Sequence, residues 1–190
     1  DLLSKNVTNK VVLVTGAGGS IGSELCSQIL LLKPRKLVLY ERNELALYSV
    51  EKTLSKANLD LIKIYPILGS ITNKLRLSKV FQKYGVETVY HAAAYKHVPL
   101  VELNNSEGVF NNVFGTLICA NVAIDEMIET FVLISTDKAV RPTNIMGATK
   151  RFSELILQAL SRKQNVTIFS MVRFGNVLGS SGSVIPIFQE

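Results

Sequence analysis

The chain has 190 residues, enough for one domain with a buried core. A hydrophobic content of 47% with only 19% charged residues excludes an intrinsically disordered protein. The net charge is +6, but the basic residues are scattered and form no stripe interleaved with aromatics, so we expect no nucleic-acid binding. A positive net charge also suits an anionic ligand that carries phosphates.

Apolar runs typical of strands alternate along the chain with segments of helical periodicity. Strands are expected at residues 11–14, 37–40, 61–68, 88–91, 131–135 and 167–173. Helices are expected between them, at residues 20–32, 44–56, 74–84, 107–127 and 144–161. This alternation predicts an α/β fold: one Rossmann-type domain over residues 1–190, with a doubly wound parallel sheet and helices on both faces.

The cysteines and the hydropathy pattern bear on the cellular setting. Cys26 and Cys119 lie far apart in apolar helical patterns, without a C-x-x-C pair, which indicates buried thiols in a reducing compartment and no metal site. No apolar run reaches the ~18 residues of a membrane span, so we expect no membrane contact by this part of the protein.

A glycine-rich segment follows the first strand and opens the first long helix. Its spacing, Gly16-x-x-Gly19-x-x-Gly22, fits the short-chain dehydrogenase form of the dinucleotide-binding fingerprint. Glycines let the backbone approach a pyrophosphate, and the helix N-terminus offers N–H groups to it. The alternative is a glycine-rich turn that binds nothing. The cofactor contacts expected here are Gly16, Gly18, Gly19, Ser20, Ile21 and Gly22.

Glu41 ends the second strand, near the ~20-residue offset at which an acid binds the adenosine ribose. A carboxylate there accepts hydrogen bonds from the ribose hydroxyls and repels a 2′-phosphate, which favours NAD. Arg42 follows at once and could pair with a 2′-phosphate, so NADP stays an alternative. An exposed glutamate at a strand end, without a ligand, is the structural alternative.

The fourth strand runs into three alanines, Ala92, Ala93 and Ala94. Small side chains there leave space for a cofactor at the carboxyl end of the strand, where open α/β sheets bind ligands. We interpret the preceding His91 as a packed or hydrogen-bonded histidine. Lys96 and His97 follow on a loop, where they either contact substrate or are solvated.

The fifth strand ends in Ser135-Thr136-Asp137-Lys138, a hydroxyl, a carboxylate and an ammonium that together form an acid/base set. Further on, Met146 and Lys150 lie four residues apart, on one helix face. Short-chain dehydrogenases place Tyr and Lys at this spacing. Methionine cannot transfer a proton, so the usual base is absent.

Four segments together resemble one family: residues 15–25, 91–100, 135–144 and 173–179. They are similar to the CapD-like nucleotide-sugar dehydratases of polysaccharide biosynthesis. This is the UDP-N-acetylglucosamine 4,6-dehydratase group of the extended short-chain dehydrogenase/reductase superfamily. The large anchored members commonly carry Met at the position of Met146.

The resemblance implies a hydro-lyase that holds NAD tightly and converts a UDP-sugar to a 4-keto-6-deoxy product. Its site residues are assigned by similarity. Asp137 is the expected acid for the leaving C6 hydroxyl, with a pKa raised by burial, and Lys138 the expected base at C5. Thr136 should hydrogen-bond the C4 oxygen, and Lys150 should hold the nicotinamide ribose. Ser70 and Ile71 are further expected cofactor contacts, and substrate contacts are expected from Lys96, His97 and Asn176.

The resemblance also implies a longer protein, of which these residues are a fragment lacking the C-terminal substrate portion. That protein is expected on the cytoplasmic face of the bacterial inner membrane, anchored there, and homo-oligomeric when complete. Two other functions stay open. A nucleotide-sugar 4-epimerase would use the same scaffold, and a non-catalytic dinucleotide-binding regulator would account for Met146.

Overall fold

The computed structural model describes residues 2–58, 62–175 and 177. Within them, six parallel strands form one sheet in the order β3-β2-β1-β4-β5-β6. This order is that of the Rossmann fold, so the fold class expected from the sequence is confirmed. The strands are β1 (Val11–Thr15), β2 (Lys36–Glu41), β3 (Lys63–Leu68), β4 (Thr88–His91), β5 (Thr130–Thr136) and β6 (Ile168–Phe174).

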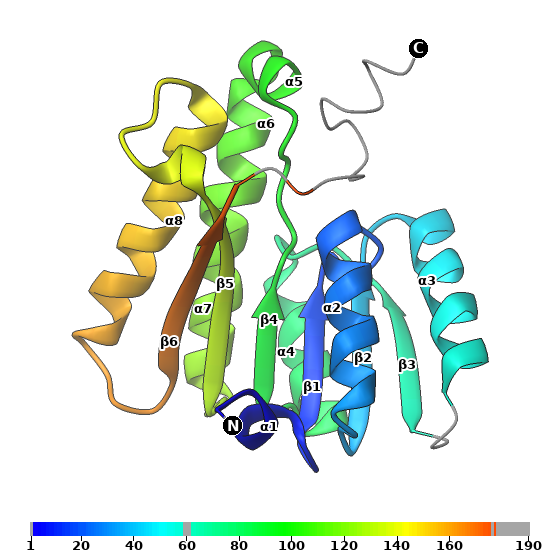
Figure 1. Ribbon diagram of the computed structural model, residues 1–190. Helices are drawn as coiled ribbons and strands as arrows, with labels where there is room; N and C mark the ends of the chain where they lie inside the picture. The colour runs from blue at the N-terminus through cyan, green and yellow to red at the C-terminus, as the bar shows by residue number, and fades with distance from the viewer. Residues whose placement is uncertain (1, 59–61, 176, 178–190) are drawn as a thin grey trace, which may run out of the picture.

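Helices cover both faces of the sheet (Figure 1). One face packs against α2 (Ser20–Leu31) and α3 (Glu44–Ala57), and the other against α4 (Lys74–Tyr84), α7 (Gly115–Asp125) and α8 (Ile145–Ser161). Successive side chains of a strand point to opposite faces. In β1, Val12 and Val14 therefore enter the first core, while Val11 and Leu13 enter the second.

Two short helices were not predicted, α1 (Leu2–Val7) and α5 (Val98–Leu103), because six residues are too few to show helical periodicity. The helix expected at 107–127 instead begins as α6 (Asn105–Val109). It then passes through the π-helical segment η1 (Phe110–Phe114) into α7. The first two residues of the strand expected at 61–68 are not in β3, and residue 61 lies outside the described part.

The continuous helix over residues 105–125 has 21 residues and a mean hydropathy of 1.2, long and apolar enough to cross a membrane. No such segment was expected from the sequence, because polar residues interrupt its apolar runs. Within the structure, 56% of this helix's apolar window is buried in the protein. Cys119 and Ala120, for example, lie in the core beside the sheet. A helix this buried fits the core helix of an α/β domain.

Both cysteines are buried and free, as the sequence predicted. Burial raises the pKa of the Cys26 thiol, and it raises the pKa of Cys119 to about 12. Thiols of this kind remain protonated at neutral pH and behave as small apolar side chains.

Candidate functional site

The glycine loop turns the chain sharply from β1 into α2. Gly16 has a φ of 67°, a left-handed conformation that favours glycine. A Cβ on Gly16 would lie 2.7 Å from the Ala93 backbone, and a Cβ on Gly22 would lie 1.9 Å from the Gly16 carbonyl oxygen. Gly19 caps the start of α2 without a side-chain hydrogen bond. The loop therefore packs against the chain after β4, and its glycines leave the backbone accessible to a phosphate-bearing ligand.

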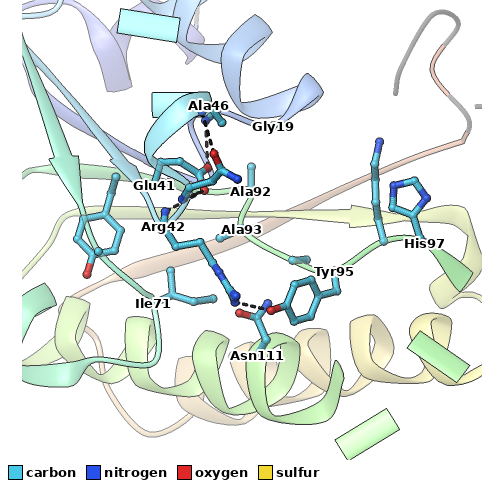
Figure 2. Close-up of a pocket in the computed structure, with 17 residues that line it drawn as sticks. Gly19, Glu41, Arg42, Ala46, Ile71, Ala92, Ala93, Tyr95, His97 and Asn111 are labelled. Atoms are coloured by element: carbon cyan, nitrogen blue, oxygen red, sulfur yellow. Dashed lines mark hydrogen bonds between the residues drawn. The ribbon is translucent and has the colours of Figure 1, made fainter. Parts of the chain in front are cut away.

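A cavity of about 520 Å³ lies beside this loop, at the carboxyl ends of β1, β2 and β4 (Figure 2). That volume lies within the range of small-molecule sites. Figure 2 shows Glu41 and Arg42 on one side of the cavity and His97 on the other. The lining residues are Gly16, Gly18, Gly19, Tyr40, Glu41, Arg42, Asn43, Ala46, Gly69, Ile71, Ala92, Ala93, Ala94, Tyr95, Lys96, His97 and Asn111.

The Glu41 carboxylate is held by three backbone N–H groups. Gly18 donates to it at 3.1 Å, Arg42 at 2.8 Å and Asn43 at 2.9 Å. The side chain is buried and lines the cavity. Because a carboxylate offers about four acceptor positions, room is left for one further donor, such as a ribose hydroxyl. Glu41 thus joins the end of β2 to the glycine loop as well as facing the cavity.

Arg42 and Tyr95 meet across the cavity wall (Figure 2). The guanidinium carbon lies 5.2 Å from the centre of the Tyr95 ring, and Nη1 donates a hydrogen bond to the Tyr95 hydroxyl. Asn112, in the π-helical segment, holds the Tyr95 backbone: its Oδ1 accepts from the Tyr95 N–H at 2.8 Å, and its Nδ2 donates to the Tyr95 carbonyl at 3.0 Å. The π-helical segment therefore fixes the loop after β4, as such segments often do at functional sites.

His91 lies beneath the cavity and is fully hydrogen-bonded. Its Nδ1 lies 2.7 Å from the Thr15 hydroxyl and its Nε2 lies 3.0 Å from the Thr116 hydroxyl. The Thr116 hydroxyl already donates to the Asn112 carbonyl, so Nε2 must carry the ring proton. Burial lowers the pKa of His91 to about 3. The interpretation of His91 as a packed, hydrogen-bonded histidine is confirmed.

The Thr136-Asp137-Lys138 set lies where β5 ends and the 3₁₀ turn η2 (Asp137–Ala139) begins. The Thr136 hydroxyl donates to Asp137 Oδ1 at 2.9 Å, and Lys138 Nζ lies 3.5 Å from the same oxygen. The Asp137 side chain is 58% exposed. The hydrogen bond from Thr136 and the charge of Lys138 lower the pKa of Asp137. The expectation that burial raises this pKa is wrong for the described structure, because the side chain faces open solvent.

Lys150 and Met146 share the buried face of α8. Lys150 is 6% exposed, and its Nζ donates a hydrogen bond of 2.6 Å to the Ile134 carbonyl at the end of β5. Burial lowers the pKa of Lys150 to about 8, although the Glu154 carboxylate opposes this shift. Met146 is also buried, at 4% exposed. The four-residue spacing thus predicted correctly that both side chains lie on one helix face.

The structure groups most of the predicted cofactor residues around one cavity. Nine of them appear in the lining given above, from the glycine loop, from the ends of β2 and β4, and at Ile71 after β3. Gly22 is packed beneath the loop instead, and Ser20 and Ile21 form the first turn of α2. Ser70 presents its carbonyl to the Tyr40 hydroxyl. In the described part of the chain, the cavity lining does not include Thr136, Asp137, Lys138 or Lys150.

Some lining residues were not predicted, and one prediction lies outside the described residues. Asn43 and Ala46 follow Glu41 closely in the sequence, and this closeness could have indicated that they line the same cavity. Asn111 lies in the π-helical segment, where two adjacent asparagines interrupt an apolar pattern. Asn176, an expected substrate contact, is not described. Within residues 2–58, 62–175 and 177, no cluster of three or more His, Cys, Asp or Glu could hold a metal.

Residues 12–190 match the model of the family described as "Polysaccharide biosynthesis protein". The chain belongs to this family. It is 48% identical to the capsular polysaccharide biosynthesis protein CapD of Staphylococcus aureus, covering 100% of this chain and 32% of CapD. It is 34% identical to an inverting UDP-N-acetylglucosamine 4,6-dehydratase of Campylobacter jejuni, covering 95% of this chain and 53% of the dehydratase. The chain thus spans about a third to a half of these relatives.

Solved structures give the same picture of the fold. The structure of Pen from Bacillus thuringiensis superimposes with a TM-score of 0.88 at 34% identity, over 97% of this chain and 57% of Pen. Epimerases are relatives as well: the UDP-glucose 4-epimerase of Rickettsia canadensis is 33% identical, over 95% of this chain and 52% of its own. A Brucella ovis UDP-glucose 4-epimerase, solved with NAD, shares the fold at a TM-score of 0.75 and 20% identity, over 90% of this chain and 54% of that epimerase.

Proposed function

We propose that the protein is an NAD-dependent nucleotide-sugar 4,6-dehydratase, acting on UDP-N-acetylglucosamine in bacterial polysaccharide biosynthesis. The observation that carries this proposal is the Thr136-Asp137-Lys138 set at the end of β5, on the same sheet edge as the glycine-lined cavity. The family, and the dehydratase name of the Campylobacter relative, support the reaction class.

The cavity fits a dinucleotide. The glycines of the loop leave its wall without side chains, and Glu41 keeps one acceptor position for a ribose hydroxyl. Lys150 supplies a buried positive charge near the end of β5. NAD bound there would supply the reversible hydride transfer that oxidises the sugar and then reduces the dehydrated sugar. We propose that Lys150 holds the nicotinamide ribose.

The acid/base set would carry out the loss of water. Lys138 takes the proton from C5 as the C5–C6 double bond forms, and Asp137 gives its proton to the C6 hydroxyl, which leaves as water. Thr136 donates a hydrogen bond to the C4 oxygen. Asp137 must be protonated at the elimination step, so we propose that a bound sugar nucleotide excludes water from it and raises its pKa.

Two further roles are the acceptance of the C4 proton and contact with the nucleotide-sugar. Met146 cannot accept the proton of the C4 hydroxyl, so this role falls to Asp137 or to a water held by Thr136. Lys96 and His97, both exposed at the cavity, would contact the nucleotide-sugar together with Asn176.

The competing function is a 4-epimerase, which the Rickettsia relative favours. An epimerase needs no elimination at C6, so the adjacent Asp137 and Lys138 count against it. The deciding experiment incubates the complete protein with NAD and UDP-N-acetylglucosamine and follows the sugar by mass spectrometry. Loss of one water supports the dehydratase, and an isomer of unchanged mass indicates an epimerase. An unaltered substrate contradicts both.

A further inference from the structure

Glu154 lies on α8, one turn beyond Lys150, and its side chain is 0% exposed. A buried carboxylate is costly unless several donors compensate for the lost water. The chemistry proposed above gives Glu154 no role, so its partners indicate what it does.

The Glu154 carboxylate accepts four hydrogen bonds. The Ser135 hydroxyl donates to Oε1 at 2.7 Å, and Arg173 Nε donates to the same oxygen at 2.8 Å. Arg173 Nη2 donates to Oε2 at 2.5 Å, and Arg151 Nη1 donates to it at 3.0 Å. The Arg173 contact is bidentate, which fixes direction as well as distance.

These partners lie at the ends of two neighbouring strands. Ser135 of β5 is paired directly with Arg173 of β6. Ser135 immediately precedes Thr136, and Gly175, two residues after Arg173, lies close enough that a Cβ on it would be 3.4 Å from Asp137 Oδ2. On the same helix, Lys150 bonds the Ile134 carbonyl. One carboxylate therefore holds both strand ends against the helix that carries Lys150.

We propose that Glu154 is a positioning residue: it fixes the ends of β5 and β6 on α8, so that Thr136, Asp137 and Lys150 keep one common arrangement. Its effect on turnover rests on the function proposed above. Its effect on the order of the strand ends does not, and the two can be measured separately.

The charge of Glu154 gives the proposal a second consequence. The groups that face the Lys150 ammonium are the Ile134 carbonyl, Glu154 on its own helix, and the neutral His91 of β4. Removing the Glu154 charge takes away the carboxylate that favours the protonated form of Lys150. Lys150 would then release its proton at lower pH.

The first test measures order directly. Hydrogen–deuterium exchange is compared in the complete protein and its Glu154→Gln variant, with Arg151→Gln as the matched control that removes the partly exposed partner. We expect peptides over residues 134–139 and 170–175 to exchange at least ~5-fold faster in Glu154→Gln only. Unchanged exchange, or equal acceleration throughout the domain, would overturn the proposal. If Glu154→Gln does not fold, Ser135→Ala is measured instead, and it should accelerate exchange at residues 134–139.

The second test separates positioning from bulk stability. For folded, NAD-binding Glu154→Gln, we expect kcat to fall at least ~10-fold with KM nearly unchanged, because small displacements of reacting groups are costly. The high-pH limb of its pH–rate profile should move to lower pH, while Glu154→Asp, which keeps the charge, should keep the wild-type limb. A kcat within twofold of wild type would refute the positioning role. A wild-type protein that releases no water would instead refute the proposed function, and exchange would still decide the role of Glu154.

Discussion

The Gly18 amide donates a hydrogen bond of 3.1 Å to the Glu41 carboxylate, which joins the glycine loop to the end of β2. One side chain thus stabilises the shape of the loop and also lines the cavity proposed to hold the cofactor. A change at Glu41 should therefore alter cofactor affinity and cofactor preference together.

The cofactor prediction follows from the charge of Glu41. Wild-type protein should bind NAD more tightly than NADP, because the buried carboxylate repels a 2′-phosphate. Glu41→Gln should weaken NAD binding and narrow this preference, whereas Glu44→Gln, at the exposed start of α3, should change neither. Titration of both cofactors into each protein measures this. Tighter binding of NADP by the wild type would mean that Arg42 governs the site.

Gly22 should tolerate no side chain. The Cβ of Gly22→Ala would lie 1.9 Å from the Gly16 carbonyl oxygen, so the loop or α2 must shift. We expect a loss of about 1–3 kcal/mol or more of unfolding free energy, together with weaker dinucleotide binding. Gly175→Ala is the control, because its Cβ would make only an ordinary contact of 3.4 Å. Equal denaturation midpoints for both variants would contradict the predicted clash.

The acid/base prediction separates Asp137 from Met146. Asp137→Asn should lower dehydration at least ~100-fold, the lower end for removal of a general acid. Met146→Leu should keep most activity, because an apolar swap of similar volume is usually tolerated at a buried position. Turnover of UDP-N-acetylglucosamine by each variant is the measurement. Losses of similar size would show that Met146 has a role beyond filling space.

Glu154 should make stability depend on pH. Burial alone would raise its pKa, but hydrogen bonds from Arg173, Ser135 and Arg151 hold the pKa at about 2, against 4.5 ordinarily. A carboxyl with a lowered folded-state pKa adds stability above pH 4.5 and loses it as the pH falls toward 2, an effect of order 3 kcal/mol. Urea unfolding should give a higher free energy of unfolding for the wild type than for Glu154→Gln at pH 7, and this difference should be smaller at pH 3. A difference in unfolding free energy that does not change with pH would contradict the predicted effect of Glu154 ionisation on stability.

Chain length should separate cofactor binding from turnover. All the lining residues named above belong to the 190-residue chain, so we expect it to bind NAD. Most of a ligand's surface must be covered for a site to orient it, and Asp137 is largely exposed here. Dehydration should therefore require the longer protein. Comparing NAD affinity and turnover of the two lengths tests this, and similar turnover by both would show that residues 1–190 build the sugar pocket.

The sequence by itself determined the fold class and most of the residues that line the glycine-loop cavity. Strand and helix periods are local properties, so the parallel sheet and its helices could be predicted from them. The glycine spacing is also a local signal: it predicted the tight turn after β1, because such a turn needs glycine's backbone freedom whatever surrounds it. Glu41 and the three alanines were predicted at strand ends, and all four line the cavity.

Only the tertiary structure decided which distant residues share an environment. The exposure of Asp137 depends on what covers the end of β5, which no local pattern records. The pairing of Ser135 with Arg173, and their common bond to Glu154, depends on strand register and on where α8 packs. Helix periodicity could not predict the partners of Glu154, because they depend on how α8 packs against the ends of β5 and β6 in the folded chain.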